Sequence, residues 1–217
     1  MPLRGSLVTM RMTERAHEFV RAVVRPGDQV IDATAGNGHD TLFLSRLVGP
    51  DGRVIAFDAQ EDAIAATRSH LGENGITDDR VLLVHDSHSA LRQHVDCPVV
   101  VVMFNLGYLP GSDHGRTTTC GETLIALAEG WEILREGGIL SVVCYRGHPG
   151  GMEEAAGVLE FAEGLRDQGA GVVISGQEDT VAGPFLVVMQ KEGKPQAHTG
   201  PEPRLLPRCR RGRPSSP

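Results

Sequence analysis

Cysteine is scarce in this sequence, and long apolar runs are absent from it. The 217 residues include 4 cysteines, and no two of them form a CxxC pair. Cysteines scattered in this way argue against a zinc site or a disulfide framework and predict reduced thiols. No apolar run approaches the roughly 20 residues that a membrane-spanning helix needs, and the N-terminus lacks the apolar core of a secretion signal. We therefore expect a cytoplasmic protein with no membrane partner and no metal.

Charge is unevenly distributed along the chain. The formal net charge is -7, but residues 201–217 contain five arginines and one glutamate and so carry +4, which leaves -11 for residues 1–200. Residues 193–217 are rich in proline and arginine and have no apolar periodicity, so we expect a disordered tail there. Such a basic tail either contacts nucleic acid or is a plain solvated extension. Residues 1–192 then form one domain, and a hydrophobic content of 40% is enough for its core.

Segments with the spacing of strands alternate with segments that have the spacing of helices. Strands are expected at 29–34, 53–59, 80–86, 98–107, 139–147, 170–177 and 184–190. Helices are expected at 13–24, 40–48, 61–75, 87–95, 119–138 and 152–168. This alternation predicts an α/β fold, Rossmann-like, with a mainly parallel seven-stranded sheet and helices on both faces. The last connection is too short for a helix, so the final strand should be antiparallel, a layout similar to that of class I methyltransferases.

Glycines and acidic residues follow the first two predicted strands. Gly36 and Gly38 allow a ligand to approach the backbone closely, and Asp58 is placed to accept hydrogen bonds from a ribose. The third glycine of a dinucleotide loop is missing, because Thr41 occupies its position. Singly, a GNG segment is most often a turn and a lone aspartate a helix cap. Together, in this order and spacing, they indicate S-adenosylmethionine binding.

The candidate cofactor-binding residues lie at the ends of the first four predicted strands, where parallel sheets bind ligands. They are Asp32, Ala35, Gly36, Asn37, Gly38, Asp40, Asp58, Gln60, Asp86, Ser87, His88 and Asn105.

Four segments together resemble one known family. They are "VIDATAGNGHDTLFLS", "VIAFDAQ", "FNLGYLPGSD" and "CYRGHPGG", and the resemblance to the "Putative rRNA methylase" family of class I methyltransferases covers about residues 9–190. Studied members of this family are S-adenosylmethionine-dependent methyltransferases for the wobble uridine of tRNA. The resemblance implies N-methylation of the 5-aminomethyl group of the wobble (2-thio)uridine, with the tRNA anticodon loop as partner. The family's "LPGGDK" loop reads Leu109 to His114 here, so His114 or Arg116 would replace its lysine on the RNA.

The end of the fourth predicted strand offers groups that suit an amine substrate. Methyl transfer needs a neutral nitrogen held in line with the methyl group and shielded from water. The Asn105 side-chain carbonyl can accept an N–H and aim the lone pair, while Tyr108 stacks on a flipped base or simply packs. Pro110 stiffens the loop, and Asp113 is a candidate proton acceptor.

The fifth predicted strand ends beside the fourth and adds further candidates. Tyr145 and Arg146 should face the same cleft, where Arg146 could meet a phosphate or stack on a base. His148 titrates near neutral pH and is a candidate proton acceptor, or else a loop histidine bonded to backbone. The catalytic candidates are thus Asn105, Tyr108, Asp113 and His148, and the substrate-binding candidates are Tyr108, Pro110, His114, Arg116, Tyr145 and Arg146.

The acidic charge of the domain counts against an RNA substrate, because tRNA-binding enzymes usually have a basic face. Methylation of a small-molecule amine is therefore an alternative, the family name implies rRNA as another, and a non-catalytic cofactor-binding subunit is a third interpretation. A homodimer is one hypothesis for how an acidic small domain builds a surface for RNA.

Overall fold

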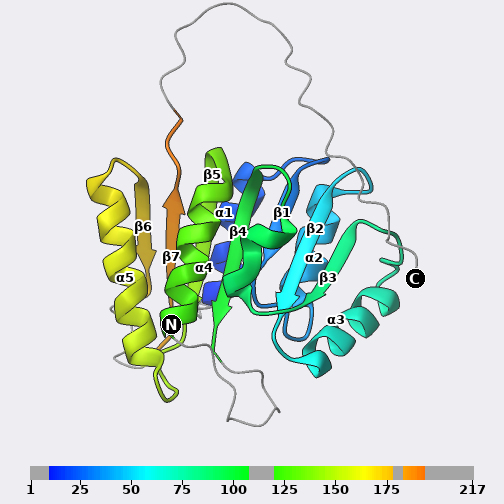
Figure 1. Ribbon diagram of the computed structural model, residues 1–217, viewed down its shortest axis with the longest axis horizontal. Helices are drawn as coiled ribbons and strands as arrows, with labels where there is room; N and C mark the ends of the chain where they lie inside the picture. Colours follow the sequence, from blue (N-terminus) through cyan, green and yellow to red (C-terminus); the bar gives the residue numbers. More distant parts are fainter. Residues whose placement is uncertain (1–9, 108–119, 178–182, 194–217) are drawn as a thin grey trace, which may run out of the picture.

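The computed structural model describes residues 10–107, 120–177 and 183–193, and within them helices cover both faces of one sheet (Figure 1). The strands are β1 (Gln29–Asp32), β2 (Arg53–Asp58), β3 (Val81–His85), β4 (Val99–Leu106), β5 (Leu134–Cys144), β6 (Gly171–Ser175) and β7 (Phe185–Gln190). The α-helices are α1 (Met12–Val23), α2 (His39–Val48), α3 (Glu61–Glu73), α4 (Cys120–Ile133) and α5 (Gly151–Asp167), and η1 (His88–His94) is a 3-10 helix.

The sheet has seven strands in the order β3-β2-β1-β4-β5-β7-β6. Pairing is parallel from β3 to β5, whereas β7 is antiparallel to both β5 and β6. This confirms the predicted class I methyltransferase layout with its antiparallel last strand. Strand order reverses between β1 and β4, and a ligand site is expected beyond their carboxyl ends. In Figure 1 these ends lie at the lower edge of the sheet.

Two apolar cores lie on opposite faces of the sheet. On one face, α1 and α2 bury residues such as Ala16, Val20 and Leu44 against strand residues that include Val101 and Val188. On the other face, α4, α5 and η1 cover a core that includes Phe104. Strands β4 and β7 are buried along nearly their whole length, because helices cover both of their sides. This rigid double-sided packing fixes the positions of the strand ends.

The boundary between α4 and β5 differs from the sequence prediction, which continued the helix to residue 138. In the structure the helix ends at Ile133, and Leu134 already pairs with Val99. The register then shifts, and Ile139 pairs with Val101. A side chain at Gly138 would approach the Val100 carbonyl oxygen to 2.8 Å, so only glycine fits this irregularity. The helical spacing of the segment was overridden by strand pairing, as tertiary contacts often override local propensity.

The predicted helix at 87–95 is a kinked 3-10 helix instead. It spans His88–His94, and its Ala90 has non-helical backbone angles. The Ser87 side chain accepts a hydrogen bond from the backbone of Ser89 and so caps the first turn. Short connections of this type are where 3-10 geometry is common.

The cysteines depart in part from the expectation drawn from composition. Cys97 is disulfide-bonded, so the prediction of a reduced thiol is wrong for this residue, whereas Cys120 and Cys144 are free. No helix among the described residues is both long enough and apolar enough to span a membrane. The predicted tail lies outside the described residues, apart from its first residue, Gly193.

Truncation of a core residue in β5 should destabilise the fold strongly. Leu140 is fully buried, and its replacement by alanine leaves a cavity between β5 and α4. We expect Leu140→Ala to lower the free energy of unfolding by about 2–5 kcal/mol in urea denaturation. Leu82 on the edge strand β3 is 37% exposed and is the matched control. Leu82→Ala should cost less than about 1 kcal/mol, and equal losses for the two variants would contradict this packing.

Candidate functional site

Backbone hydrogen bonds join the loops that follow the parallel strands. Each of them connects a residue just past the end of one strand to the end of a neighbouring strand. They are Ala33 N to Met103 O (2.8 Å), Ala35 N to Phe57 O (2.8 Å), Asp86 N to Asp58 O (3.1 Å) and Tyr145 N to Leu106 O (3.2 Å). The ends of β1, β2, β3, β4 and β5 therefore form one continuous rim. The sequence predicted this convergence from the parallel sheet alone.

The glycine loop is closed tightly against α3. Gly36 donates its N–H to Asp58 Oδ2 at 2.9 Å, and its carbonyl accepts from Thr67 Oγ1 at 3.0 Å. Gly38 begins α2 with a φ of 80°, and a side chain there would lie 2.9 Å from the Thr67 backbone. Glycine is thus required at Gly38 for both its left-handed conformation and its space. The first turn of α2 follows directly, and backbone N–H groups at the start of a helix are available to bind a ligand.

Asp58 is the acidic residue predicted to bind a ribose. Its Oδ2 accepts from Gly36 and its Oδ1 accepts from the backbone of Gln60 at 2.9 Å. The residue is only half-buried. A carboxylate has about four lone-pair positions, so acceptor capacity is left for hydroxyl groups. Asp58 can therefore hold the loop and accept hydrogen bonds from a diol at the same time.

Asp32 is turned into the protein. It is 1% exposed and accepts hydrogen bonds from Thr41 Oγ1 at 2.6 Å and from Thr34 N at 3.1 Å. Burial, followed by the nearby carboxylate of Asp40, raises the pKa of Asp32 to about 7. Asp32 therefore binds the loop after β1 and the first turn of α2 through these hydrogen bonds. Its predicted direct contact with the cofactor stays a prediction.

Asp40 and Asn105 face one another across the point where strand order reverses. Asn105 Nδ2 donates to Asp40 Oδ2 at 3.4 Å, and Asn105 N donates to Thr34 Oγ1 at 2.8 Å. The other oxygen of Asp40 lies 2.6 Å from Nε2 of His17. The sequence predicted Asp40 and Asn105 as site residues but not this pairing.

The loop after β3 is bound to itself and to η1. Asp86 accepts from the backbone of Ser87 at 2.8 Å and lies 3.3 Å from Nε2 of His94. His88 is 8% exposed, packs edge-on against the ring of Phe104, and has a pKa lowered mainly by burial. A buried neutral imidazole suits an apolar wall beside a ligand better than a charged contact.

The loop after β5 contributes Tyr145, Arg146 and His148. Tyr145 is 38% exposed, and its ring lies beside Gly107 at the end of β4. Its pKa is raised, mainly by burial and also by the charge of Asp40, against a smaller opposing effect of Arg11. Tyr145 therefore lies beside the end of β4, and its predicted contact with the substrate stays a prediction.

Arg146 and His148 are held largely by the protein itself. Arg146 donates to the carbonyls of Gly183 at 3.0 Å and Gln177 at 3.4 Å, and its guanidinium lies over the ring of Phe185. Nδ1 of His148 lies 3.0 Å from the Pro149 carbonyl, and the residue is 9% exposed. Because a carbonyl only accepts hydrogen bonds, Nδ1 of His148 is the donor in this contact.

The remaining predicted residues divide into two groups. Ala35 is buried in the glycine loop, and Asn37 is exposed at its tip. Five others lie outside the described residues, namely Tyr108, Pro110, Asp113, His114 and Arg116.

Sequence reasoning missed several residues that build the site. His17, Thr34 and Thr67 come from three different elements, and each bonds a predicted site residue. No motif marks His17 or Thr67, because their partners are 23 and 31 residues away in sequence. Thr41 carried a signal, since it replaces the third glycine of a dinucleotide loop, and its hydroxyl binds Asp32.

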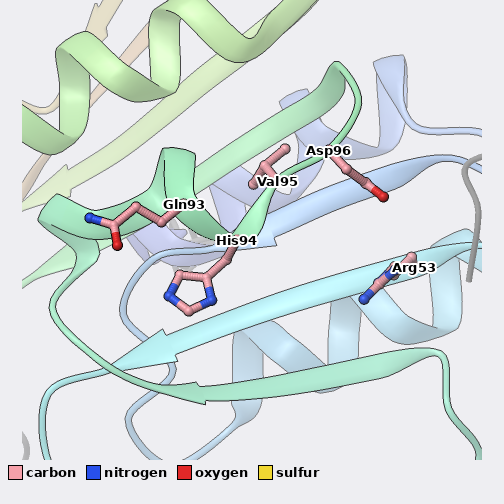
Figure 2. A pocket seen from close by; sticks show the side chains of 5 residues that line it. All are labelled: Arg53, Gln93, His94, Val95 and Asp96. Atoms are coloured by element: carbon pink, nitrogen blue, oxygen red, sulfur yellow. The ribbon is translucent and has the colours of Figure 1, made fainter. Parts of the chain in front are cut away.

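A hollow beside β2 is connected to this rim through His94, whose Nε2 lies 3.3 Å from Oδ2 of Asp86. Arg53, Gln93, His94, Val95 and Asp96 line it beside β2 and the connection from η1 to β4 (Figure 2). It contains no residue of the predicted site. No group of His, Cys, Asp and Glu side chains in the described part of the chain could hold a metal ion.

The raised pKa of Asp32 predicts a pH-dependent stability. In the folded protein its pKa is about 7, against an ordinary 3.8. The folded state therefore favours the protonated carboxyl, and Asp32 costs stability as the pH rises from about 4 to about 7. Asparagine is neutral at any pH. The free energy of unfolding of Asp32→Asn minus that of the natural protein should therefore increase by more than about 1 kcal/mol when the pH is raised from about 5 to about 8.

Urea denaturation of both proteins at both pH values measures this difference. The other titrating groups are common to the two proteins and cancel. A difference that stays constant with pH would show that Asp32 is ionised without cost in the folded state.

Comparison with known proteins gives the family. The family model described as "Putative rRNA methylase" matches residues 54–191, and a model of protein-L-isoaspartate O-methyltransferase matches residues 6–93. A chloroplastic tRNA (mnm(5)s(2)U34)-methyltransferase of Arabidopsis thaliana is 42% identical over 164 residues, which are 71% of this chain and 60% of that protein. The chain thus spans less than two thirds of the length of this relative.

Two crystal structures are similar over 85% of this chain. One, described as a "putative rRNA-methylase" from Clostridium thermocellum, is 41% identical with a TM-score of 0.81, and all of that chain is covered. The other, described as a "putative methyltransferase" from Streptococcus mutans in complex with SAH, is 36% identical with a TM-score of 0.76, and 99% of it is covered. This chain therefore belongs to the "Putative rRNA methylase" family of S-adenosylmethionine-dependent class I methyltransferases.

Proposed function

We propose that the protein methylates tRNA, transferring a methyl group from S-adenosylmethionine to the 5-aminomethyl nitrogen of the wobble (2-thio)uridine. The observation that carries this proposal is the 42% identity to a methyltransferase whose name gives this tRNA position. The position of Asn105 at the rim, beside Asp40, supports it. The family membership supports the methyl transfer. What we propose beyond the family membership is the base that receives the methyl group.

The glycine loop and Asp58 suit the cofactor. Asp58 retains acceptor capacity for a ribose diol, and Gly38 allows a ligand to approach the start of α2. Asp40 and Asp58 lie close enough to Asp32 to raise its pKa, and their carboxylates give this rim a negative potential, which favours a cation. The cofactor, when bound, supplies an electrophilic methyl group on a sulfonium.

Asn105 suits an amine as the methyl acceptor. A primary amine is protonated at neutral pH and has no free lone pair until it loses a proton. The Asn105 side-chain oxygen can accept an N–H of the neutral amine and direct its lone pair toward the methyl group. Among the described residues, His148 at the loop after β5 is the candidate for removing that proton.

The charge of α1 offers a surface for RNA on an otherwise acidic domain. Arg11, Arg21 and Arg25 are exposed on or beside this helix. Arg11 lies close enough to Tyr145 for its charge to oppose the rise in the Tyr145 pKa, so the N-terminal end of α1 lies near the rim. Phosphates of an anticodon stem could bind these arginines while the base enters the site.

The direct test uses tRNA that carries 5-aminomethyl-2-thiouridine at the wobble position. The enzyme and isotopically labelled S-adenosylmethionine are incubated with it, and the digested nucleosides are analysed by mass spectrometry. We expect label in 5-methylaminomethyl-2-thiouridine and tRNA binding that weakens as salt increases. Label in rRNA or in free amines without RNA would support the alternative substrates, and cofactor binding without any transfer would support a non-catalytic subunit.

Loss of the Asp58 carboxylate should weaken cofactor binding. Asp58→Ala removes the ribose acceptor and releases Gly36 and Gln60, so we expect at least an approximately 100-fold increase in the dissociation constant by calorimetry. Asp62 is exposed in the first turn of α3 and is the charge-matched control. Asp62→Ala should bind normally, and an unchanged affinity in Asp58→Ala would refute the ribose assignment.

A further inference from the structure

We propose that Asp40, held in place by His17, is a positioning residue that sets the orientation of the Asn105 side chain for methyl transfer. This inference rests on the proposed function, because the orientation matters only if Asn105 receives an amine. In this proposal Asp40 contacts Asn105 rather than the substrate and acts through it.

The contacts of Asp40 decide which way the Asn105 amide faces. Asp40 is 9% exposed at the start of α2, and its Oδ2 lies 3.4 Å from Nδ2 of Asn105. An ionised carboxylate only accepts hydrogen bonds, so the amide must present its NH₂ group to it. The reversed amide would place two oxygens against each other. The Asn105 carbonyl is therefore left to point away from Asp40, available to an incoming N–H.

His17 fixes Asp40 from the opposite side. Its Nε2 lies 2.6 Å from Asp40 Oδ1, and its ring stacks on Phe43 with centroids 3.6 Å apart and planes 7° apart. Arg21 covers the Phe43 ring, with 4.8 Å from the guanidinium carbon to the centroid. Rotation of His17 would break this stack, so helix α1 holds Asp40 in one orientation.

The backbone of Asn105 is fixed independently of its side chain. Its N–H donates to Thr34 Oγ1 at 2.8 Å, and the residue lies within the paired strand β4. What is left to set is the side-chain amide, which can exchange its oxygen and nitrogen by a half-turn. An exchanged amide would offer an amine substrate only donors. Asp40 supplies the charge that prevents this exchange.

The test is a double-mutant cycle on the single-turnover rate of methyl transfer at saturating cofactor. Because the cofactor is saturating, Asp40→Ala should lower this rate about 10–100-fold even where loss of its charge also weakens cofactor binding. In the Asn105→Ala background, Asp40→Ala should have no further effect beyond about twofold, because the residue through which it acts is gone. Multiplicative losses, or a loss of cofactor affinity with an unchanged saturated rate, would overturn the proposal.

Two substitutions at His17 extend the test with the Asp40 side chain intact. His17→Phe keeps the stack on Phe43 and removes the bond to Asp40, so it should lower the rate in the same direction as Asp40→Ala. His17→Gln can place an amide nitrogen near the position of Nε2 and should recover part of the loss. Thermal unfolding checks that the variants fold, and equal rates for the two His17 variants would contradict the positioning role.

A measurement without substrate separates this inference from the proposed function. In the natural protein, the side-chain NH₂ signal of Asn105 in nitrogen-15 NMR should exchange slowly with water and disappear in Asn105→Ala. In Asp40→Ala it should shift and exchange faster. A natural enzyme that methylates no tRNA would refute the proposed function alone, whereas an Asn105 signal unaffected by Asp40→Ala would refute the positioning role alone.

Discussion

Hydrogen bonds between the loops of neighbouring parallel strands are the constraint on which the site depends. A parallel strand ends with backbone groups that its own ladder does not use, and burial makes unpaired groups costly. Here Ala33, Ala35 and Asp86 donate these bonds to the ends of adjacent strands. Each bond satisfies a backbone group and also brings two loops together. The strand ends are thus held as one rim by the same bonds that stabilise the fold.

The rim concentrates negative charge, and this charge has a cost in the free protein. Asp32 is buried close enough to Asp40 and Asp58 for their charges to raise its pKa. Hydrogen bonds from Thr34 and Thr41 offset part of that cost. A cation in the rim would favour the ionised forms, so cofactor binding and the charge state of the rim are coupled. The buried carboxylates therefore connect stability to ligand binding.

Helix α1 connects the site to the rest of the molecule. Its apolar side packs against β4, β5 and β7, while His17 reaches the rim and contacts Asp40. The same helix carries exposed arginines on the side away from the core. One element thus contributes to core packing, to the order of the site and to the surface proposed for RNA. The opposite face, with α4 and α5, contributes mainly the apolar core and the wall formed by His88 and Phe104.

The order of strands and helices, the parallel sheet with its antiparallel last strand and the convergence of the strand ends could all be read from the sequence. These follow from periodicity and from the length of the connections, which are local properties of the chain. The spacing of Gly36, Gly38 and Asp58 was also sufficient to place them at the same edge of the sheet, and in the structure Gly36 donates a hydrogen bond to Asp58 there. The end of α4 was not predictable in this way, since pairing of Leu134 with Val99 decided it.

Only the tertiary structure decided which side chains act together. The sequence named Asp32, Asp40 and Asn105 as separate candidates, whereas folding turns Asp32 inward to Thr41 and sets Asp40 between His17 and Asn105. These partners are up to 65 residues apart, and no spacing rule connects them. Local spacing determines which groups reach the rim, because strand and loop geometry repeat along the chain. Packing of distant elements determines how those groups are oriented and charged, because burial and hydrogen-bond partners exist only in the folded molecule.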